Sequence, residues 1–437
     1  MARVNTVAVN PRKTHEGATA HPINPVQELR RSVMACMLWE GSFYESGASI
    51  AERISDLCKQ VRPDDISKIA IEARTQFKLR HVPLLLAREL ARTSGPLVSH
   101  TIEQVIQRAD ELSEFVSIYW KDKKQPLSAQ VKKGLAKAFR KFDAYQLAKY
   151  NRDNVVKLRD VLFLCHAKPK DEKQAETWKQ LVEGKLPIPD TWETKLSAGA
   201  DKAETFQRLM AEENLGGLAF LRNLRNMDQS GVPKADVRAY AGKVKVDRIL
   251  PFRFIAAARA VPGWEDVIEP MMLRALASAE KLPGRTVIVV DNSGSMDGAK
   301  VSAKSDIDRS DAACALAILL REICDDCTVI GYGTDAAIVP PRRGFALADA
   351  IQKGHGGGTD TAKALALANQ KPYNRIIVIT DEQTHTVIGN PKGLGYFINV
   401  ATYKNGIGYG AWNHIDGFSE SVIDWIRQFE KTNAESL

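Results

Sequence analysis

The chain has 437 residues, of which 44% are hydrophobic and 26% charged, and its formal net charge is +8. This length accommodates two or more domains with full cores, and the composition is ordinary for a soluble globular protein. No stretch approaches the apolar length needed to cross a bilayer, so the sequence excludes a membrane-spanning protein and predicts no membrane partner.

The first residues, 1–24, are polar, with scattered proline and threonine and no apolar core. This composition does not suit a signal peptide and predicts a flexible N-terminal arm. The six cysteines are too scattered to form a disulfide framework in a chain of this size. We therefore expect a reducing, cytoplasmic location.

Residues 25–282 predict a long series of helices. Apolar residues return every three or four positions, as in 84–92 and 97–106, which is the period of an amphipathic helix. The breaks between these segments are short and contain Pro, Gly or Asp. Helices joined so tightly pack as antiparallel neighbours, and a long series of them forms a solenoid or ring. Residues 171–202, by contrast, are expected to be a looser insertion.

Positive charge is concentrated in this helical part. Residues 1–280 contain 45 Lys and Arg against 35 Asp and Glu, whereas the remaining residues contain 16 against 18. Residues 121–170 alone contain 14 basic and 4 acidic side chains. Their excess of positive charge therefore equals that of all residues 1–280. A charge run is usually a solvated face, but this concentration over two or three helices exceeds what solubility requires.

The window contains one helix whose spacing predicts a basic stripe. Five cations fall mostly on one exposed side: Lys132, Lys133, Lys137, Arg140 and Lys141. The residues turned inward are Leu135, Ala138, Phe139 and Phe142. Such a stripe neutralises phosphates, which makes the binding of a polyanion salt-dependent. Tyr145 and Tyr150 offer stacking surfaces to unpaired bases, although helical tyrosines at this spacing are more often core residues.

A histidine closes the last helix of the window. His166 precedes Lys168 and Pro169, and the proline ends the helix. The helix dipole favours a histidine at this end whatever its function. The purely structural interpretation of His166 is therefore a helix cap.

The pattern changes from helix to strand after residues 281–284, where we place the domain boundary. Residues 285–437 then alternate strands and helices in the order of a doubly wound α/β sheet. The expected strands are 285–291, 327–333, 375–381 and 396–402. The expected helices are 306–323, 345–352, 360–369 and 419–430.

Five oxygen ligands for one divalent cation are predicted in this domain. Two buried strands end in the carboxylates Asp291 and Asp381, Ser293 and Ser295 follow the first of them, and a glycine-rich loop leads to Thr359. Ligands of a doubly wound sheet bind outside the carboxyl ends of its strands, so these groups converge. Two carboxylates and three hydroxyls, some acting through water, suit Mg²⁺ and leave one coordination position open.

This arrangement resembles the von Willebrand factor A domain and its metal-ion-dependent adhesion site. All five ligand types of that family stand at matching positions. In the family, an acidic group of a partner usually fills the open metal position, so the resemblance implies adhesion and not catalysis.

Four short segments in the helical part carry a second resemblance when they are read together with the A domain. They are residues 148–152 (AKYNR), 164–169 (LCHAKP), 221–224 (LRNL) and 249–253 (ILPFR). They are similar to segments of the Ro/TROVE RNA-binding proteins, including the bacterial Ro-related ones, and occur in the family order. The resemblance implies a HEAT-like ring of helical repeats over 25–282, closed by the A domain over 285–437.

The resemblance also implies a non-catalytic ribonucleoprotein component that acts in RNA quality control. Family members bind small noncoding Y RNA on the outer basic surface as monomers and admit single-stranded ends of misfolded RNA to a central hole. In bacteria the partner can be polynucleotide phosphorylase, an exoribonuclease. The predicted RNA contacts are Lys132, Lys133, Lys137, Arg140, Lys149, Arg152, His166 and Lys168.

Other functions stay open at this point. In a metal-dependent adhesion scaffold, the A domain would grip an acidic partner and the helices would only dock. Chaperone or chelatase subunits also use this domain, but their usual acidic or proline-rich linker is missing. A nuclease or phosphatase would use Asp291 and Asp381 with metal, yet most predicted ligands are hydroxyls, and no Ser-His-Asp or Cys-His arrangement is apparent.

Overall fold

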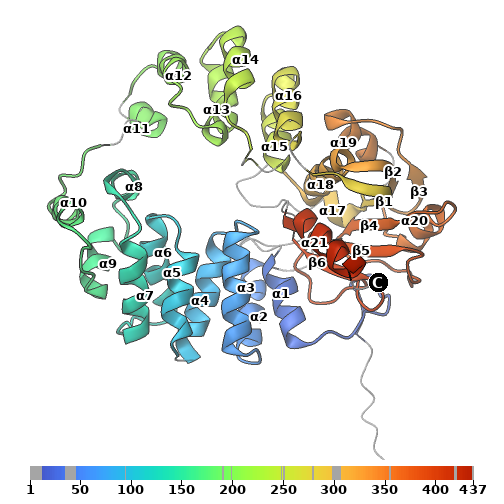
Figure 1. Ribbon diagram of the computed structural model, residues 1–437, viewed down its shortest axis with the longest axis horizontal. Helices are drawn as coiled ribbons and strands as arrows, with labels where there is room; N and C mark the ends of the chain where they lie inside the picture. The colour runs from blue at the N-terminus through green and yellow to red at the C-terminus, as the bar shows by residue number, and fades with distance from the viewer. Residues whose placement is uncertain are drawn as a thin grey trace, which may run out of the picture.

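The computed structural model describes residues 12–34, 46–93, 95–188, 191–197, 199–247, 249, 251–277, 280–297, 307–353, 356–417 and 421–435. A curved series of helices is followed by an α/β domain, and both ends of the series meet that domain, so that the molecule is a ring (Figure 1). The predicted class, a ring of helical repeats followed by a doubly wound domain, is confirmed.

The helical series has two halves. The first contains α1 (Pro25–Met34), α2 (Gly47–Cys58), α3 (Pro63–Thr75), α4 (His81–Thr93), α5 (Leu97–Val105), α6 (Asp110–Tyr119), α7 (Ala129–Phe139), α8 (Ala144–Tyr150), α9 (Leu158–Cys165) and α10 (Glu172–Glu183). The second contains α11 (Trp192–Ser197), α12 (Lys202–Ala211), α13 (Gly217–Gln229), α14 (Lys234–Lys243), α15 (Pro251–Ala260), the 3-10 turn η1 (Pro262–Trp264) and α16 (Glu265–Leu276).

The helix starts follow from capping residues in the sequence. Ser128 opens α7 by accepting a hydrogen bond from the Val131 amide, and Asp143 and Gln146 form a capping box at the start of α8. These side chains satisfy amide donors that the first turn of a helix leaves unpaired. The short polar breaks in the sequence therefore become the junctions of antiparallel helices.

Residues 171–202 differ from the predicted loose insertion because α10 is a regular helix. Asp171 accepts a hydrogen bond from the Gln174 amide at its start, and Gly184 ends it in the left-handed conformation at φ 71°. The buried side is narrow and includes Trp178, whose ring meets Phe139 edge-on at 5.3 Å. The remaining positions are largely charged or polar, which hides the helical period in the sequence.

Two large apolar clusters divide the ring. One contains buried side chains of α1 to α10, from Leu29 to Leu181. The other runs from Phe206 to Ile426 and joins the second helical half to one face of the sheet. A smaller cluster covers the other sheet face. The second helical half and the α/β domain thus share one core.

The sheet has six strands in the order β3-β2-β1-β4-β5-β6. They are β1 (Leu282–Asp291), β2 (Cys324–Tyr332), β3 (Ala336–Ile338), β4 (Arg375–Thr380), β5 (Leu394–Asn399) and β6 (Asn413–Asp416). The helices are α17 (Gly294–Asp297), α18 (Arg309–Ile323), α19 (Gly344–Gln352), α20 (Thr361–Ala368) and α21 (Ser421–Glu435). All pairings are parallel except that of the edge strand β3 with β2. The four expected strands are present with shifted ends, and the short β3 and β6 were not predicted.

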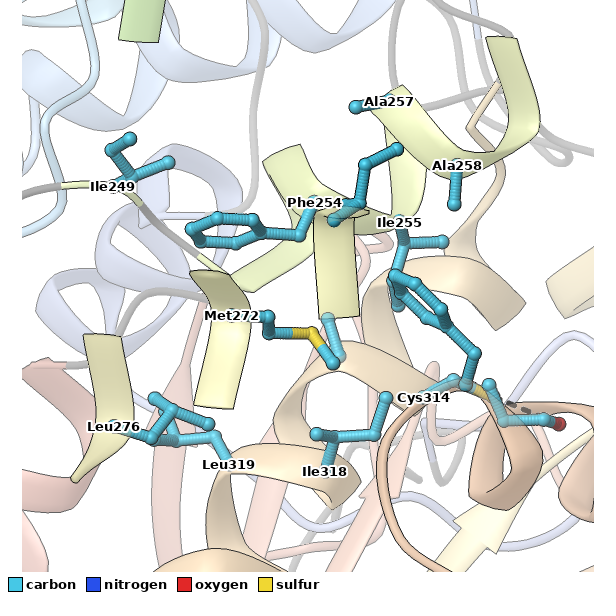
Figure 2. Close-up of a cluster of buried hydrophobic side chains, with 14 of the residues drawn as sticks. Ile249, Phe254, Ile255, Ala257, Ala258, Met272, Leu276, Cys314, Ile318 and Leu319 are labelled. Carbon is cyan, nitrogen blue, oxygen red and sulfur yellow. Dashed lines mark hydrogen bonds between the residues drawn. The ribbon is translucent and has the colours of Figure 1, made fainter. Parts of the chain in front are cut away.

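The last helices of the ring join the α/β domain through apolar side chains. Figure 2 shows Phe254 and Ile255 of α15, Met272 of α16, and Ile318 and Leu319 of α18 in one cluster of buried side chains, with Met272 between Phe254 and the residues of α18. These residues are buried, so the contact is part of a continuous core and fixes the end of the ring. We call it the apolar seam.

The N-terminal segment differs from the expected flexible arm where the structure describes it. Residues 12–24 lie against the α/β domain: the Thr14 hydroxyl donates to the Thr384 carbonyl at 2.7 Å, and the His21 amide donates to the Gly406 carbonyl at 3.1 Å. Residues 1–11 lie outside the described part of the chain. Within that part, no helix has both the length and the apolar character that a bilayer crossing requires.

Candidate metal centre and nucleic-acid interface

The predicted cation site lies where two neighbouring strands end. Asp291 is the last residue of β1, and Asp381 directly follows β4. These strands pair in parallel, with Val290 opposite Ile379, so both carboxylates lie at the same edge of the sheet. Topology therefore brings together two residues that are far apart in the sequence.

The two serines complete this side of the site. The Ser293 amide donates to Asp291 Oδ1 at 2.9 Å, and the hydroxyls of Ser293 and Ser295 lie 3.3 Å apart. Ser295 also forms a side-chain hydrogen bond with Asp381. The turn after β1 thus points both hydroxyls toward the pair of carboxylates.

The glycine-rich loop brings Thr359 to the same place. The Gly294 amide donates to the Gly357 carbonyl at 3.0 Å, and the Thr384 hydroxyl donates to the Thr359 carbonyl at 2.8 Å. The loop is therefore tied both to the turn after β1 and to the segment after β4. All five predicted ligands are buried.

The electrostatics of the site suit a cation. Asp291 and Asp381 are buried, and burial raises the pKa of both carboxyl groups. The charge of Asp381 raises the pKa of Asp291 further. A divalent cation between the carboxylates would relieve both the desolvation and the repulsion. The donor set thus fits Mg²⁺, whose binding stays a prediction.

Two further residues hold Asp291 in place and were not predicted. The Thr380 hydroxyl donates to Asp291 Oδ2, and the Tyr332 hydroxyl lies 3.3 Å from the same oxygen. Such outer partners orient a metal ligand. Thr380 precedes Asp381 in the sequence and could have been found from the strand pattern, whereas Tyr332 comes from the neighbouring strand β2.

The site opens into a cavity of about 580 Å³ between the two domains. Ser293 and Gly294 line it from the metal side, Asp297 and Asp308 lie at its acidic part, and Arg259 lines it from α15. Within the described residues, no three His, Cys, Asp or Glu side chains gather as a metal site. The predicted ligand set itself consists of three hydroxyls and two carboxylates.

Six of the eight predicted RNA contacts lie on α7, at its end, or directly after α9. Leu135, Ala138 and Phe139 are buried as predicted, Lys133 and Arg140 are exposed, and Lys132 is half-buried. Arg140 Nε donates to the Lys168 carbonyl at 2.8 Å, which ties the end of α7 to the loop after α9. His166 adjoins this loop.

The stripe on α7 is less continuous than predicted. Lys137 Nζ lies 3.2 Å from Glu103 of α5, and Lys141 donates to two backbone carbonyls of the α5 end. Among the described residues, no carboxylate forms an ion pair with Lys132, Lys133, Arg140 or Lys168. These four cations remain available to a polyanion, while Lys137 is partly neutralised.

Lys149 and Arg152 form a separate group. Lys149 of α8 lies 3.8 Å from Glu193 of α11, and Arg108 stacks over the adjacent Tyr150 ring at 4.7 Å. Arg152 is exposed, without an ion-pair partner in the described part of the chain. No hydrogen bond or ion pair between described residues connects this group with the cations of α7. Tyr150 is thus already stacked, whereas Tyr145 is 51% exposed.

His166 caps α9 as predicted and has a left-handed backbone at φ 52°. Its side chain is exposed, and so is Phe163, three residues earlier, at 60%. The His166 amide donates to the Phe163 carbonyl at 3.3 Å, so an exposed aromatic residue stands in the last turn before the predicted contact. The buried positions of α9 are Leu158, Val161, Leu162 and Cys165. The helical period therefore places Phe163 on the exposed side, and the sequence could have indicated this.

Three arginines in the second helical half were not predicted as contacts. Arg222 and Arg225 are exposed on α13, and Arg253 is exposed on the neighbouring α15. Desolvation by the surrounding helices and then the charge of Arg222 lower the pKa of Arg253, so the two guanidinium groups repel each other although Arg253 keeps an exposed surface. Both stand in the segments 221–224 and 249–253 that were singled out above.

Comparison with known proteins accounts for both parts of the ring. A family model for the TROVE domain matches residues 27–184 and 182–274, and a model for the von Willebrand factor type A domain matches residues 286–383. The crystal structure of the Deinococcus radiodurans RO (RSR) protein is similar, with a TM-score of 0.58 and 16% sequence identity. The match covers 91% of this chain and 97% of that chain, which shows a common fold.

Proposed function

Because this chain belongs to the TROVE-domain family, we propose that it is a non-catalytic, RNA-binding component of a ribonucleoprotein. The observation that carries the proposal is the group of cations on α7, at its end and in the loop after α9, which lack carboxylate partners among the described residues. Proteins leave such groups uncompensated where a polyanion supplies the opposite charge.

The proposed RNA is a small, structured, noncoding Y-like RNA bound on the basic outer surface by Lys132, Lys133, Arg140, His166 and Lys168. Phosphate contacts of this kind position an RNA without reading its sequence. Single-stranded or misfolded RNA ends would enter the centre of the ring. The protein would act in the quality control of such RNA, with polynucleotide phosphorylase or another exoribonuclease as its partner. The protein would act as a cytoplasmic monomer.

The α/β domain is proposed to bind Mg²⁺ through Asp291, Ser293, Ser295, Thr359 and Asp381. When bound, the cation offers one open coordination position to an acidic group. Tyr332 and Thr380 orient Asp291 through its Oδ2, and Arg259 lines the cavity that the acidic group would enter. This donor set supports adhesion.

The proposal is tested by extracting and sequencing RNA from the intact purified protein. We expect a small structured RNA in nearly stoichiometric amount, and its loss after charge reversal of Lys132 and Lys133. Charge reversal of two other exposed lysines, Lys68 and Lys371, is the matched control. A protein free of nucleic acid, but able to bind an acidic partner with Mg²⁺, would instead support a metal-dependent adhesion scaffold.

A further inference from the structure

The two ends of the helical series meet the α/β domain through different chemistry. At the apolar seam, α15 and α16 share a core with α18 (Figure 2). Among the described residues, the buried apolar side chains of α1 belong to a cluster without a member from the α/β domain. Arg31 of α1 contacts that domain through hydrogen bonds and an ion pair, and we call this end of the ring the polar seam.

The centre of the polar seam is Arg31 of α1. Its guanidinium is fully buried, with Nη1 3.2 Å from Glu382 Oε1, and Nη2 donates to the Asn405 carbonyl at 2.9 Å. His414 of β6 lies 2.6 Å from the same Glu382 oxygen and 3.5 Å from Asp416. A cavity of about 330 Å³, lined by Arg30, Glu72, Phe77, His414, Ile415 and Trp425 among others, adjoins this cluster, so the seam is incompletely packed.

The contacts of the polar seam continue directly from the metal site. Asp381 is a predicted ligand, and the next three residues all hold the N-terminal segment. Glu382 pairs with Arg31, Gln383 Oε1 accepts a hydrogen bond from the His15 amide at 2.7 Å, and the Thr384 carbonyl accepts one from Thr14 at 2.7 Å. The segment 381–384 therefore begins with a predicted metal ligand, and its other three residues contact the N-terminal segment.

The segment 381–384 is also constrained from the metal side. The Gln383 amide donates to Asp381 Oδ1 at 3.0 Å, and Thr384 donates to Thr359. Glu382 has a left-handed backbone at φ 62°, which residues other than glycine rarely adopt. A shift of Asp381 therefore cannot be absorbed within the segment without moving the groups that hold Thr14, His15 and Arg31.

We infer that cation binding between Asp291 and Asp381 and docking of residues 12–34 on the α/β domain are thermodynamically coupled. A cation draws together two buried carboxylates that otherwise repel each other, which fixes residues 382–384 in the geometry that the polar seam requires. The apolar seam holds the other end of the ring, so metal binding stabilises ring closure. This inference rests on the proposed metal site and is independent of RNA binding.

Hydrogen exchange in the intact protein tests the coupling in one direction. The His15 and His21 amides donate to the α/β domain, and we expect them to exchange about tenfold more slowly in Mg²⁺ than in chelator, a typical coupling between sites. Amides of α5, which packs against α3, α4 and α7 of the first half among the described elements, are the internal control and should not respond. Equal exchange of the His15 and His21 amides in both conditions, with Mg²⁺ bound, would overturn the inference.

Linkage requires the reverse effect of the same size. Arg31→Gln should weaken Mg²⁺ binding about tenfold in a calorimetric titration. Arg12→Gln is the matched control, because Arg12 contacts Glu28 within the same segment and leaves the polar seam untouched. Thr14→Val, which removes one hydrogen bond to Thr384, serves as the milder variant if Arg31→Gln fails to fold, and should weaken binding severalfold.

The outcomes separate the coupling from the metal site. An unchanged Mg²⁺ affinity in both seam variants would refute the coupling alone. Failure of the unaltered protein to bind Mg²⁺ would refute both the coupling and the proposed site.

Discussion

Arg31 Nη1 lies 3.2 Å from Glu382 Oε1, so the first helix of the ring pairs with the residue beside a predicted metal ligand. Both side chains are fully buried. Removal of one partner of such a pair leaves the other charge buried and uncompensated, which typically costs about 3–5 kcal/mol. We expect Arg31→Met and Glu382→Gln each to lower the free energy of unfolding by about this amount in denaturant titrations.

The double variant is the control for this pair. Arg31→Met combined with Glu382→Gln removes both charges and should cost clearly less than the sum of the single variants. Additive losses would show that the two side chains stabilise the polar seam independently.

The polar seam is expected to weaken in alkaline solution. Burial opposes ionisation of His414, but Asp416 and Glu382 outweigh it and raise the pKa of His414 from 6.5 to about 9. Its stabilising contribution is therefore complete below pH 6.5 and is lost as the pH rises through 9. The free energy of unfolding should fall over this range in the unaltered protein and much less in His414→Gln. If the free energy of unfolding fell equally with pH in the unaltered protein and in His414→Gln, His414 would not be the group responsible.

Acid weakens the same seam through Glu382. Burial opposes ionisation here too, yet Arg31 and His414 lower the pKa of Glu382 from 4.5 to about 2. The contribution of Glu382 is therefore complete above pH 4.5 and is lost as the pH falls toward 2. The polar seam should be most stable between about pH 4.5 and 6.5, which native-state hydrogen exchange of residues 12–34 would measure.

Substitution of a predicted metal ligand should change stability in opposite directions with and without cation. Burial and the charge of Asp381 raise the pKa of Asp291, so the ionised carboxylate is unfavourable in chelator. Asp291→Asn should raise the thermal midpoint in chelator by a few degrees, roughly the effect of 1 kcal/mol. The same substitution should abolish the rise in thermal midpoint that Mg²⁺ produces in the unaltered protein.

Asp325 provides the control, because it is an exposed carboxylate in β2. Asp325→Asn should change neither midpoint. A Mg²⁺-induced rise that persists in Asp291→Asn would remove Asp291 from the ligand set.

Trp178 should be a core residue although the sequence predicts a loose insertion around it. Its side chain is buried against Phe139, and truncation of a large buried aromatic costs about 3–5 kcal/mol. We expect this loss for Trp178→Ala in denaturant unfolding. Trp192→Ala on α11, where the ring is only half-buried, should cost much less, and equal costs would contradict the packing of α10.

The sequence predicts those features that local pattern determines. The apolar run before Asp291 and the run before Asp381 specify central strands, and adjacent parallel strands must bring their ends together. The meeting of Asp291 and Asp381 at one edge of the sheet could therefore be predicted, whereas their binding of a cation stays a prediction. The short strands β3 and β6 could not, because three or four residues pair only where the rest of the sheet already exists.

Partners that approach from other helices could not be predicted either. The neutralisation of Lys137 by Glu103 depends on how α5 packs against α7, and nothing near Lys137 in the sequence signals it. The pairing of Arg31 with Glu382 likewise depends on closure of the whole ring. Charge counts along the chain thus locate a basic region but overstate the number of cations that remain uncompensated.

RNA retention as a function of salt concentration is the decisive measurement for RNA binding by the cations of α7. We expect a small structured RNA to bind the unaltered protein in a filter assay, with an affinity that falls steeply as salt rises. Charge reversal of Lys132 and Lys133 should weaken binding and reduce the slope of log affinity against log salt by roughly 1.5, or about 0.7 to 0.9 for each phosphate contact. The same reversal at Lys68 and Lys371 should leave the slope unchanged, and an unaltered slope in the Lys132 and Lys133 variant would contradict RNA binding by this surface.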